Sequence, residues 1–317
     1  MRVSLITTVL NEEKTIDVFL DSVAAQTKKP DEVIVVDGGS VDWTIDKLQR
    51  RGVSDINLKI MSEPGANRSQ GRNAGVKIAT GEIVAITDAG CVLDKDWLSE
   101  ITKPFSDPKV EVVAGYYRGM AKTIFEKCVI PFVLVMPNEV DPNNFYPASR
   151  SMAIRKGTFW QVGGFPEEFS DNEDYVFANV LAKNNIKSFF AKGAIINWLP
   201  RSNLKSFWTM IYRFARGDSK AGLRRKKVAT VFGRYLIFMI LLGILITNWI
   251  TQLLFSYLAI WFIYLLWAIG KNFQYIKDVR AIFLLPILQV TADLAVMAGT
   301  FAGLSQKNPP TLKLQKG

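Results

Sequence analysis

Histidine is absent from this chain of 317 residues, and cysteine occurs only twice. Since histidine is the commonest general base, any proton transfer must use a carboxylate, a tyrosine or a lysine. Cys91 and Cys128 imply no disulfide framework and suit a reducing compartment. No secretory signal is expected, because the apolar start at Val3 is short and Arg2 alone makes no basic leader.

Long apolar runs are missing before about residue 227 and dominate the chain after it. The runs 235–250 and 253–270 are near the minimum of about 17 residues for crossing a bilayer. The stretch 281–304 is weaker, because it contains Pro286 and Asp293. Buried helices of a soluble domain remain an alternative, more for the third stretch than for the first two. We expect two membrane-spanning helices and a third that either spans or lies in the interface.

Acidic residues are nearly absent between Arg201 and Arg234. This segment has ten basic residues against one acid, Asp218, and so carries most of the formal net charge of +10. A basic cluster beside apolar spans marks the cytoplasmic side of a membrane more simply than it marks a nucleic-acid site. We therefore expect a multi-pass protein of the cell membrane whose large domain is cytoplasmic, with no nucleic-acid partner.

The amino-terminal part alternates strand and helix patterns. Short β-branched runs at Val3–Val9, Val33–Asp37 and Glu82–Asp88 are predicted strands. Helical patterns at 14–25, 42–51 and 69–79 lie between them. This alternation predicts an α/β domain with a parallel sheet covered on both faces. No Gly-x-Gly-x-x-Gly follows the first strand, which disfavours dinucleotide binding.

Polar clusters follow each predicted strand and should meet at one edge of the sheet. They are Asn11-Glu12, Asp37-Gly38-Gly39-Ser40 and Asp88-Ala89-Gly90. Ordinary turn chemistry explains any one of them alone. Arg68 and Arg72 are near the start of the third helix, where a guanidinium can meet a diphosphate or simply face solvent.

Four motifs in this order resemble the family 2 glycosyltransferases of the Rossmann-like GT-A fold. They are Val-Leu-Asn-Glu-Glu at 9–13, Asp-Gly-Gly-Ser-Val-Asp-Trp-Thr at 37–44, Gly-Arg-Asn-Ala-Gly at 71–75, and Gly-Gly-Phe-Pro-Glu-Glu-Phe at 163–169 followed by Asn-Glu-Asp-Tyr at 172–175. The resemblance covers about residues 1–220. It implies an inverting, hexosyltransferase-type enzyme that uses a UDP-, GDP- or dTDP-sugar.

The resemblance also assigns the donor site. Asp37 would hold the nucleobase, with Glu12 and the backbone of Thr8 and Leu10 near the same ring. Asp88 would stand where the family's Asp-x-Asp pair coordinates Mg2+ or Mn2+ across the donor diphosphate. The second carboxylate of that pair is Gly90 here, so we expect metal affinity without donor to be low. Arg72 would be a further nucleotide-sugar contact.

The resemblance places the catalytic base in the acidic cluster near residue 174. An inverting transfer needs a base, because the acceptor hydroxyl loses its proton as it attacks. Asp174 is the preferred base, with Glu173 and Asp171 as lesser candidates. The alternative is a helix amino terminus, where acids complement the dipole. Arg213 and Arg216 lie in an aromatic-and-arginine segment that helps hold donor and acceptor in family members, and lipid-facing charge explains them equally well.

We expect a domain order of 1–220 for the GT-A domain, 221–234 for a basic juxtamembrane segment, 235–304 for transmembrane or interfacial helices and 305–317 for a polar tail. The membrane helices favour a lipid or lipid-linked glycan acceptor, as in polysaccharide or glycolipid biosynthesis. The apolar run 129–136 either dips into the interface or belongs to a core strand or helix. A nucleotide-sugar-binding scaffold with little or no catalysis is the main alternative, because Gly90 replaces a carboxylate, and a nucleotidyltransferase is a weaker one.

Overall fold

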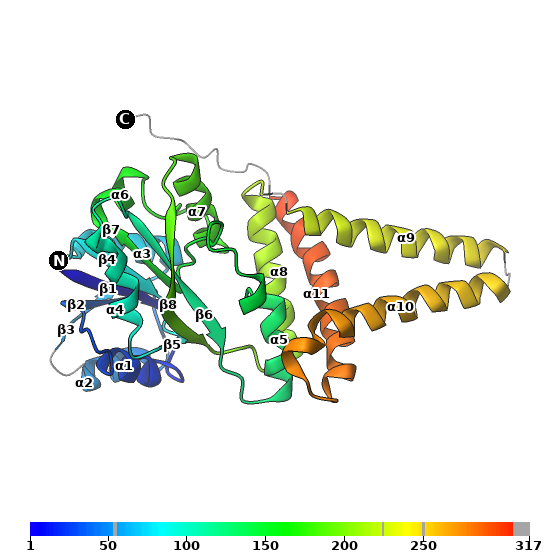
Figure 1. The fold of residues 1–317 in the computed structure, drawn as a ribbon, viewed down its shortest axis with the longest axis horizontal. Helices are drawn as coiled ribbons and strands as arrows, with labels where there is room; N and C mark the ends of the chain where they lie inside the picture. The colour runs from blue at the N-terminus through cyan, green and yellow to red at the C-terminus, as the bar shows by residue number, and fades with distance from the viewer. Residues whose placement is uncertain (53–55, 224, 249–250, 307–317) are drawn as a thin grey trace. The chain divides into compact units, whose positions relative to one another are not determined.

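A computed structural model describes residues 1–52, 56–223, 225–248 and 251–306, which divide into two compact units (Figure 1). The first unit contains residues 1–120 and 135–199, and the second contains 121–134 and the described residues from 200 onwards. The part of the expected polar tail at 307–317 lies outside the described residues.

A mixed β-sheet forms the centre of the first unit. Its strands are β1 (Val3–Val9), β2 (Glu32–Asp37), β3 (Asn57–Ser62), β4 (Ile83–Thr87), β5 (Cys91–Leu93), β6 (Val112–Gly119), β7 (Ser151–Arg155) and β8 (Ser188–Trp198). They lie in the order β3-β2-β1-β4-β7-β6-β8-β5. Strands β1 to β4 are parallel to one another, as predicted for β1, β2 and β4, whereas β7 is antiparallel to both β4 and β6. The sheet is therefore mixed beyond the strands that the sequence predicted.

Helices connect these strands. They are α1 (Ile16–Ala24), α2 (Thr44–Arg51), α3 (Arg68–Ile78), α4 (Trp97–Thr102), α6 (Lys156–Gln161) and α7 (Glu173–Lys183), with short 3-10 turns at Lys103–Ser106 and Pro137–Glu139. The three helices predicted from the sequence are present, with ends within two residues of those expected. Helix α3 begins sharply, because Asn67 and Gln70 form a capping box.

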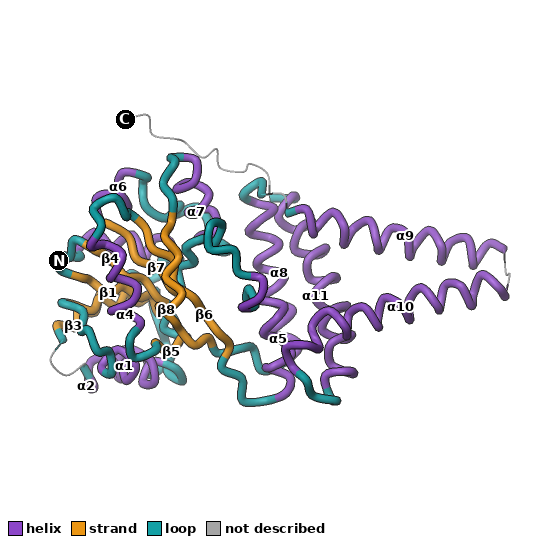
Figure 2. Tube along the Cα trace, viewed as in Figure 1, coloured by secondary structure: helices purple, strands orange, loops and turns teal. Residues whose placement is uncertain are grey.

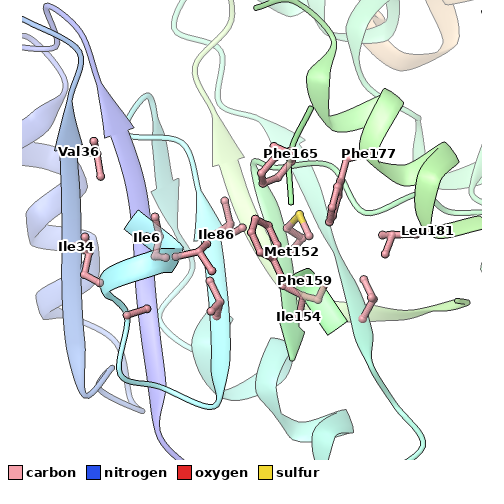
Figure 3. Packing of buried hydrophobic residues seen from close by; sticks show 14 of the residues in the cluster. Ile6, Ile34, Val36, Ile86, Met152, Ile154, Phe159, Phe165, Phe177 and Leu181 are labelled. Carbon is pink, nitrogen blue, oxygen red and sulfur yellow. The ribbon is translucent and has the colours of Figure 1, made fainter. Parts of the chain in front are cut away.

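The core of this unit has two sides. Ile6, Ile34 and Val36 point to one face, where they pack with Phe159 and Phe177 (Figure 3). The intervening residues of the same strands are also fully buried, and successive strand residues point to opposite faces. Both faces of β1 and β2 are therefore covered, which leaves the ends of these strands accessible for polar groups.

The second unit is helical (Figure 2). It contains α5 (Ile124–Val133), α8 (Leu204–Lys220), α9 (Lys226–Asn248), α10 (Thr251–Ile276) and α11 (Ala281–Leu304). Segments of α9, α10 and α11 are long and apolar enough to cross a membrane, with 22, 24 and 24 residues. The described parts of the predicted apolar runs are therefore helical, and α9 begins earlier, at Lys226. Residues 249–250 of the first run lie outside the described residues. The apolar run 129–136 mostly forms α5, which supports the helical alternative.

Helix α11 is packed differently from α9 and α10. In the most apolar 18-residue segment of α11, 39% of the residues are buried, against 11% in the corresponding segments of α9 and α10. Helix α11 lies along α8, where a Cβ added to Gly299 would be 2.3 Å from the Tyr212 carbonyl oxygen. Asp293 of α11 accepts a hydrogen bond from Tyr264 of α10 at 2.6 Å and pairs with Arg234 of α9 at 3.1 Å. Helix α11 thus contacts the start of α9 and the second half of α10.

Candidate active site

The ends of the central strands bring the predicted site residues to one edge of the sheet. Val9 pairs with Asp37 across β1 and β2, and Asp88 directly follows β4. Because β7 is antiparallel, its first residue lies at this same edge, where Ser151 pairs with Thr87. Arg150, just before β7, therefore reaches the edge together with Asp88.

Asp88 is an accessible carboxylate within a positive environment. Its side chain is 41% exposed, and its Oδ1 accepts a hydrogen bond from Arg72 Nη2 at 2.9 Å. Burial alone would raise the pKa of Asp88, but the guanidinium groups of Arg72, Arg150 and Arg68 lower that pKa below its ordinary value. Asp88 is therefore ionised at neutral pH and presents negative charge at the strand edge.

Arg72 is buried and joins two acidic groups. Its side chain is 1% exposed, and its Nη1 lies 2.5 Å from Glu173 Oε1, while its Nη2 contacts Asp88. The guanidinium also lies 5.3 Å from the ring centroid of Phe165. Both nearby carboxylates raise the pKa of Arg72 against the opposing effect of burial. This burial excludes the alternative of a solvated helix face for Arg72, and its predicted contact with the nucleotide sugar stays a prediction.

Asp174 differs from its neighbour Glu173 in its surroundings. Glu173 is 3% exposed and forms an ion pair with Arg72. Asp174 is half-buried in the first turn of α7. Burial, followed by the charge of Glu173, raises the pKa of Asp174, and Arg150 and Arg72 oppose that rise. A carboxylate with a raised pKa is a stronger proton acceptor than an ordinary aspartate. The raised pKa distinguishes Asp174 from Glu173, and its role as the base stays a prediction.

Two of the sequence motifs bind each other directly. Asn73 of the 71–75 motif donates through Nδ2 to the Phe165 carbonyl at 2.8 Å and accepts from the Phe165 amide at 2.9 Å. Gly164 has φ +73°, and a Cβ there would lie 2.9 Å from Asn73 Oδ1. The 71–75 motif thus holds the 163–169 loop, which leads into α7 and Asp174.

The loops after β1 and β2 are tied together. Asn11, at φ 57°, donates its backbone amide to Ser40 Oγ at 2.9 Å, and the Glu12 amide donates to Thr44 Oγ1 at 2.8 Å. Thr8 is half-buried and Leu10 is 55% exposed beside these contacts.

Asp37 is 3% exposed, and its carboxylate accepts hydrogen bonds from the Gly39 and Ser40 amides and the Ser40 hydroxyl. The Asp37 carboxylate thus stabilises the loop that follows β2. A nucleobase could bind it only through the lone pairs that these hydrogen bonds leave unused.

The residues around Asp88 could hold a metal ion only if most of its ligands came from water and from a bound substrate. Among the described residues, no cluster of three acidic or cysteine side chains is suited to hold an ion. Gly90 supplies no carboxylate, although a Cβ there would meet nothing within 4 Å. One carboxylate oxygen is a sufficient protein ligand for Mg2+ only when water and phosphate oxygens complete the shell.

Arg150 was not singled out from the sequence, although it directly precedes a strand. Its guanidinium carbon lies 5.2 Å from the ring centroid of Tyr117 and 6.0 Å from that of Trp198. The surrounding segment, Ala-Ser-Arg-Ser, carries no motif that indicates a site. The position of Arg150 at the strand edge follows only from the antiparallel pairing of β7 with β4.

Arg213 and Arg216 lie on α8 in the second unit, and their proposed roles stay predictions.

Comparison with known proteins identifies the family. Residues 4–163 match the profile of Glycosyl transferase family 2. The chain is 34% identical over 116 residues to glycosyltransferase AglE of Haloferax volcanii, which is 36% of this chain and 38% of that protein. It is 23% identical over 239 residues to the O-antigen chain rhamnosyltransferase RfbN of Salmonella typhimurium, which is 66% of this chain and 71% of that protein. The chain thus spans well under half of AglE.

A solved structure extends the likeness to the fold of nearly the whole chain. The mannosyltransferase PcManGT of Pyrobaculum calidifontis, in complex with GDP-Man and Mn2+, superposes with a TM-score of 0.62 at 20% identity. The match covers 97% of this chain and 88% of that one. The fold is of the GT-A type followed by apolar helices, and the chain belongs to Glycosyl transferase family 2.

Proposed function

We propose that this glycosyltransferase moves a hexosyl group from a nucleotide sugar to a lipid or lipid-linked glycan acceptor, with inversion at the anomeric carbon. The observation that carries the proposal is that one buried guanidinium connects Asp88 to the start of the helix that carries Asp174. Arg72 contacts Asp88 and also Glu173, the residue next to Asp174. Asp88, on the donor side, and Asp174, the proposed base, are thereby held at the same edge of the sheet.

Asp174 is the proposed base. As the acceptor oxygen attacks the anomeric carbon, its proton passes to the Asp174 carboxylate and the nucleoside diphosphate leaves with the electrons of the broken bond. The raised pKa of Asp174, caused by burial and by Glu173, suits this transfer. Glu173 acts indirectly, because its charge both fixes Arg72 and strengthens Asp174 as a base.

Asp88 is the proposed metal ligand. A Mg2+ or Mn2+ ion bound with the donor would neutralise charge on the leaving diphosphate. The single accessible carboxylate and the empty space at Gly90 support an ion shared with donor phosphate rather than a preformed site. The interlocked loops carrying Thr8, Leu10, Glu12 and Asp37 would contact the nucleobase. The GDP-Man and Mn2+ of the similar mannosyltransferase support this assignment.

The membrane arrangement follows from the charge of the α9–α10 pair. Lys226, Lys227 and Arg234 lie in the first part of α9, and Lys271 in the last part of α10. Many apolar side chains farther along both helices are exposed, among them Met239 at 64% and Phe262 at 61%. We assign the charged ends to the cytoplasmic side by the positive-inside rule, so the catalytic domain, to about residue 220, would be cytoplasmic and 221–234 its basic link to the membrane.

In this arrangement helix α11 would lie near the cytoplasmic interface, against the start of α9 and the second half of α10. Its greater burial, its packing along α8 and its contacts with the charged part of α9 support this position. Arg213 and Arg216 of α8 would then be close to lipid headgroups or an acceptor. A membrane-held acceptor suits an enzyme built this way.

The test uses the full chain in detergent or lipid with Mn2+ or Mg2+, a panel of UDP-, GDP- and dTDP-sugars, and lipid-phosphate and glycolipid acceptors. Release of nucleoside diphosphate with a product of inverted anomeric configuration is the expected result. Asp174→Asn should abolish turnover and leave donor affinity within about twofold. Retention of anomeric configuration, or normal turnover by Asp174→Asn, would reject the mechanism.

Orientation is tested separately by cysteine labelling in sealed cells. Lys227→Cys should be protected from an impermeant thiol reagent added outside. Labelling of Lys227→Cys from outside would reverse the assigned orientation.

A further inference from the structure

Arg150 is a cation whose hydrogen-bonding capacity the protein does not use. No hydrogen bond or ion pair of its guanidinium is found among the described residues, and its Nη1 is buried without a partner. Buried polar atoms nearly always have partners, so an unpaired one in a native structure calls for an explanation. The guanidinium of Arg72, which is fully buried, is by contrast committed to Glu173 and Asp88.

The fold holds Arg150 in place without using its hydrogen-bond donors. Its carbonyl accepts a hydrogen bond from Thr87 Oγ1 at 2.9 Å, which fixes the backbone beside the end of β4. The guanidinium lies over the rings of Tyr117 and Trp198. Cation–π contacts position a guanidinium through its flat faces and leave the N–H groups at its rim free to bind.

Arg150 lies next to residues that contact both proposed functional carboxylates or their neighbours. Its carbonyl is bound by Thr87, which directly precedes Asp88, and the amide of Ser149 donates to Asp174 Oδ2 at 3.4 Å. The charge of Arg150 lowers the pKa of Asp88 and opposes the rise in the pKa of Asp174. It also opposes the burial that raises the pKa of Tyr117 to about 12, so the phenol beside it stays neutral. A guanidinium with free N–H groups is suited to bidentate recognition of phosphate oxygens.

We propose that Arg150 binds a phosphoryl group of a substrate between Asp88 and Asp174. This inference rests on the function proposed above and goes beyond it by naming a ligand for an unassigned residue. The phosphoryl group belongs either to the donor diphosphate or to the head of a phosphate-bearing lipid acceptor. In either position Arg150 supplies positive charge at the strand edge where Gly90 offers no carboxylate to a metal ion.

The experiment compares the full-length wild type with Arg150→Met and Arg150→Lys. Arg50→Met is the matched control, because Arg50 is exposed in the last turn of α2. Calorimetry measures affinity for GDP and UDP, with and without Mn2+, and for guanosine and uridine as phosphate-free probes. Steady-state kinetics then give KM for the nucleotide sugar and for a short polyprenyl monophosphate.

For a donor phosphate, Arg150→Met should weaken diphosphate binding at least tenfold and leave nucleoside binding unchanged. For an acceptor phosphate, diphosphate binding should persist while KM for the polyprenyl phosphate rises at least tenfold. Arg150→Lys should recover part of the loss in either case. The acid limb of the kcat profile should also move to higher pH in Arg150→Met, because Asp174 loses a cation that lowers its pKa.

Two failures remain distinct. Wild-type protein that binds no nucleoside diphosphate and transfers no sugar would overturn both the proposed function and this inference. Wild-type binding and transfer, with Arg150→Met equal to Arg50→Met in every affinity and KM, would overturn the role of Arg150 alone.

Discussion

Arg72 Nη1 lies 2.5 Å from Glu173 Oε1, and these two side chains are 1% and 4% exposed. The residues are 101 positions apart in the chain, so this contact ties α3 to the start of α7. Breaking a buried ion pair leaves one charge without compensation, which costs far more than losing a pair at the surface.

Arg72→Met should therefore destabilise the protein by about 3–5 kcal/mol. Thermal unfolding of the full chain in detergent checks this as a fall in the midpoint temperature. Lys47→Met is the control, because the Lys47–Asp17 pair is 37% and 39% exposed and its loss should cost less than about 1 kcal/mol. Similar midpoints for the two variants would mean that the buried pair is not a structural link.

Gly90→Asp should raise the affinity for Mn2+ in the absence of donor. A Cβ at Gly90 meets nothing within 4 Å, so the aspartate fits without strain and supplies a second carboxylate two residues from Asp88. Two hard oxygen ligands hold a divalent ion more tightly than one, and we expect at least a fivefold change by calorimetry. Gly157→Asp is the control, because Gly157 is exposed with equally open space on α6. Equal Mn2+ affinity of both variants would show that position 90 does not face the ion.

Asp174→Asn should stabilise the protein at neutral pH while removing its activity. Burial and Glu173 raise the pKa of Asp174 in the folded state, so the folded state resists ionisation more than the unfolded chain does. The ionised carboxylate thus costs stability above its folded pKa, and this cost disappears as pH falls below the ordinary value near 3.8.

Midpoint temperatures measured from pH 3 to pH 8 check this prediction. The difference between Asp174→Asn and wild type should be positive at pH 7 and shrink towards acid. Asp46→Asn, on α2 of the same unit, should follow the wild type. A difference that grows towards acid would contradict the raised pKa.

Gly299→Ala should destabilise the helical unit. The added Cβ would lie 2.3 Å from the Tyr212 carbonyl oxygen and 3.0 Å from the Ala215 Cβ, so α8 and α11 would have to separate. Gly243→Ala is the matched control, since its Cβ meets nothing within 4 Å and alanine favours a helix by about 1 kcal/mol over glycine. Opposite shifts of the midpoint temperature, downward for Gly299→Ala and upward for Gly243→Ala, are expected.

Much of the fold was predictable because its signals are local. Alternating β-branched and amphipathic segments gave β1, β2, β4 and the helices between them, since each pattern depends only on neighbours in the chain. Strand β3 was missed, because Asn57–Ser62 is only partly buried and carries Asn57 and Lys59 among its apolar residues. The antiparallel β7 was missed because strand direction depends on partners far away in sequence.

The sequence alone determined the family motifs, the apolar helices and the position of Asp88 at a strand end, because each is a property of consecutive residues. Only the tertiary structure decided that Arg72 is buried against Glu173, that Asn73 holds Phe165, and that Arg150 lies near enough to Asp88 and Asp174 to lower the pKa of each. These contacts depend on the order and direction of strands, which bring distant segments to one edge. The charge environment that distinguishes Asp174 from Glu173 exists only after that assembly.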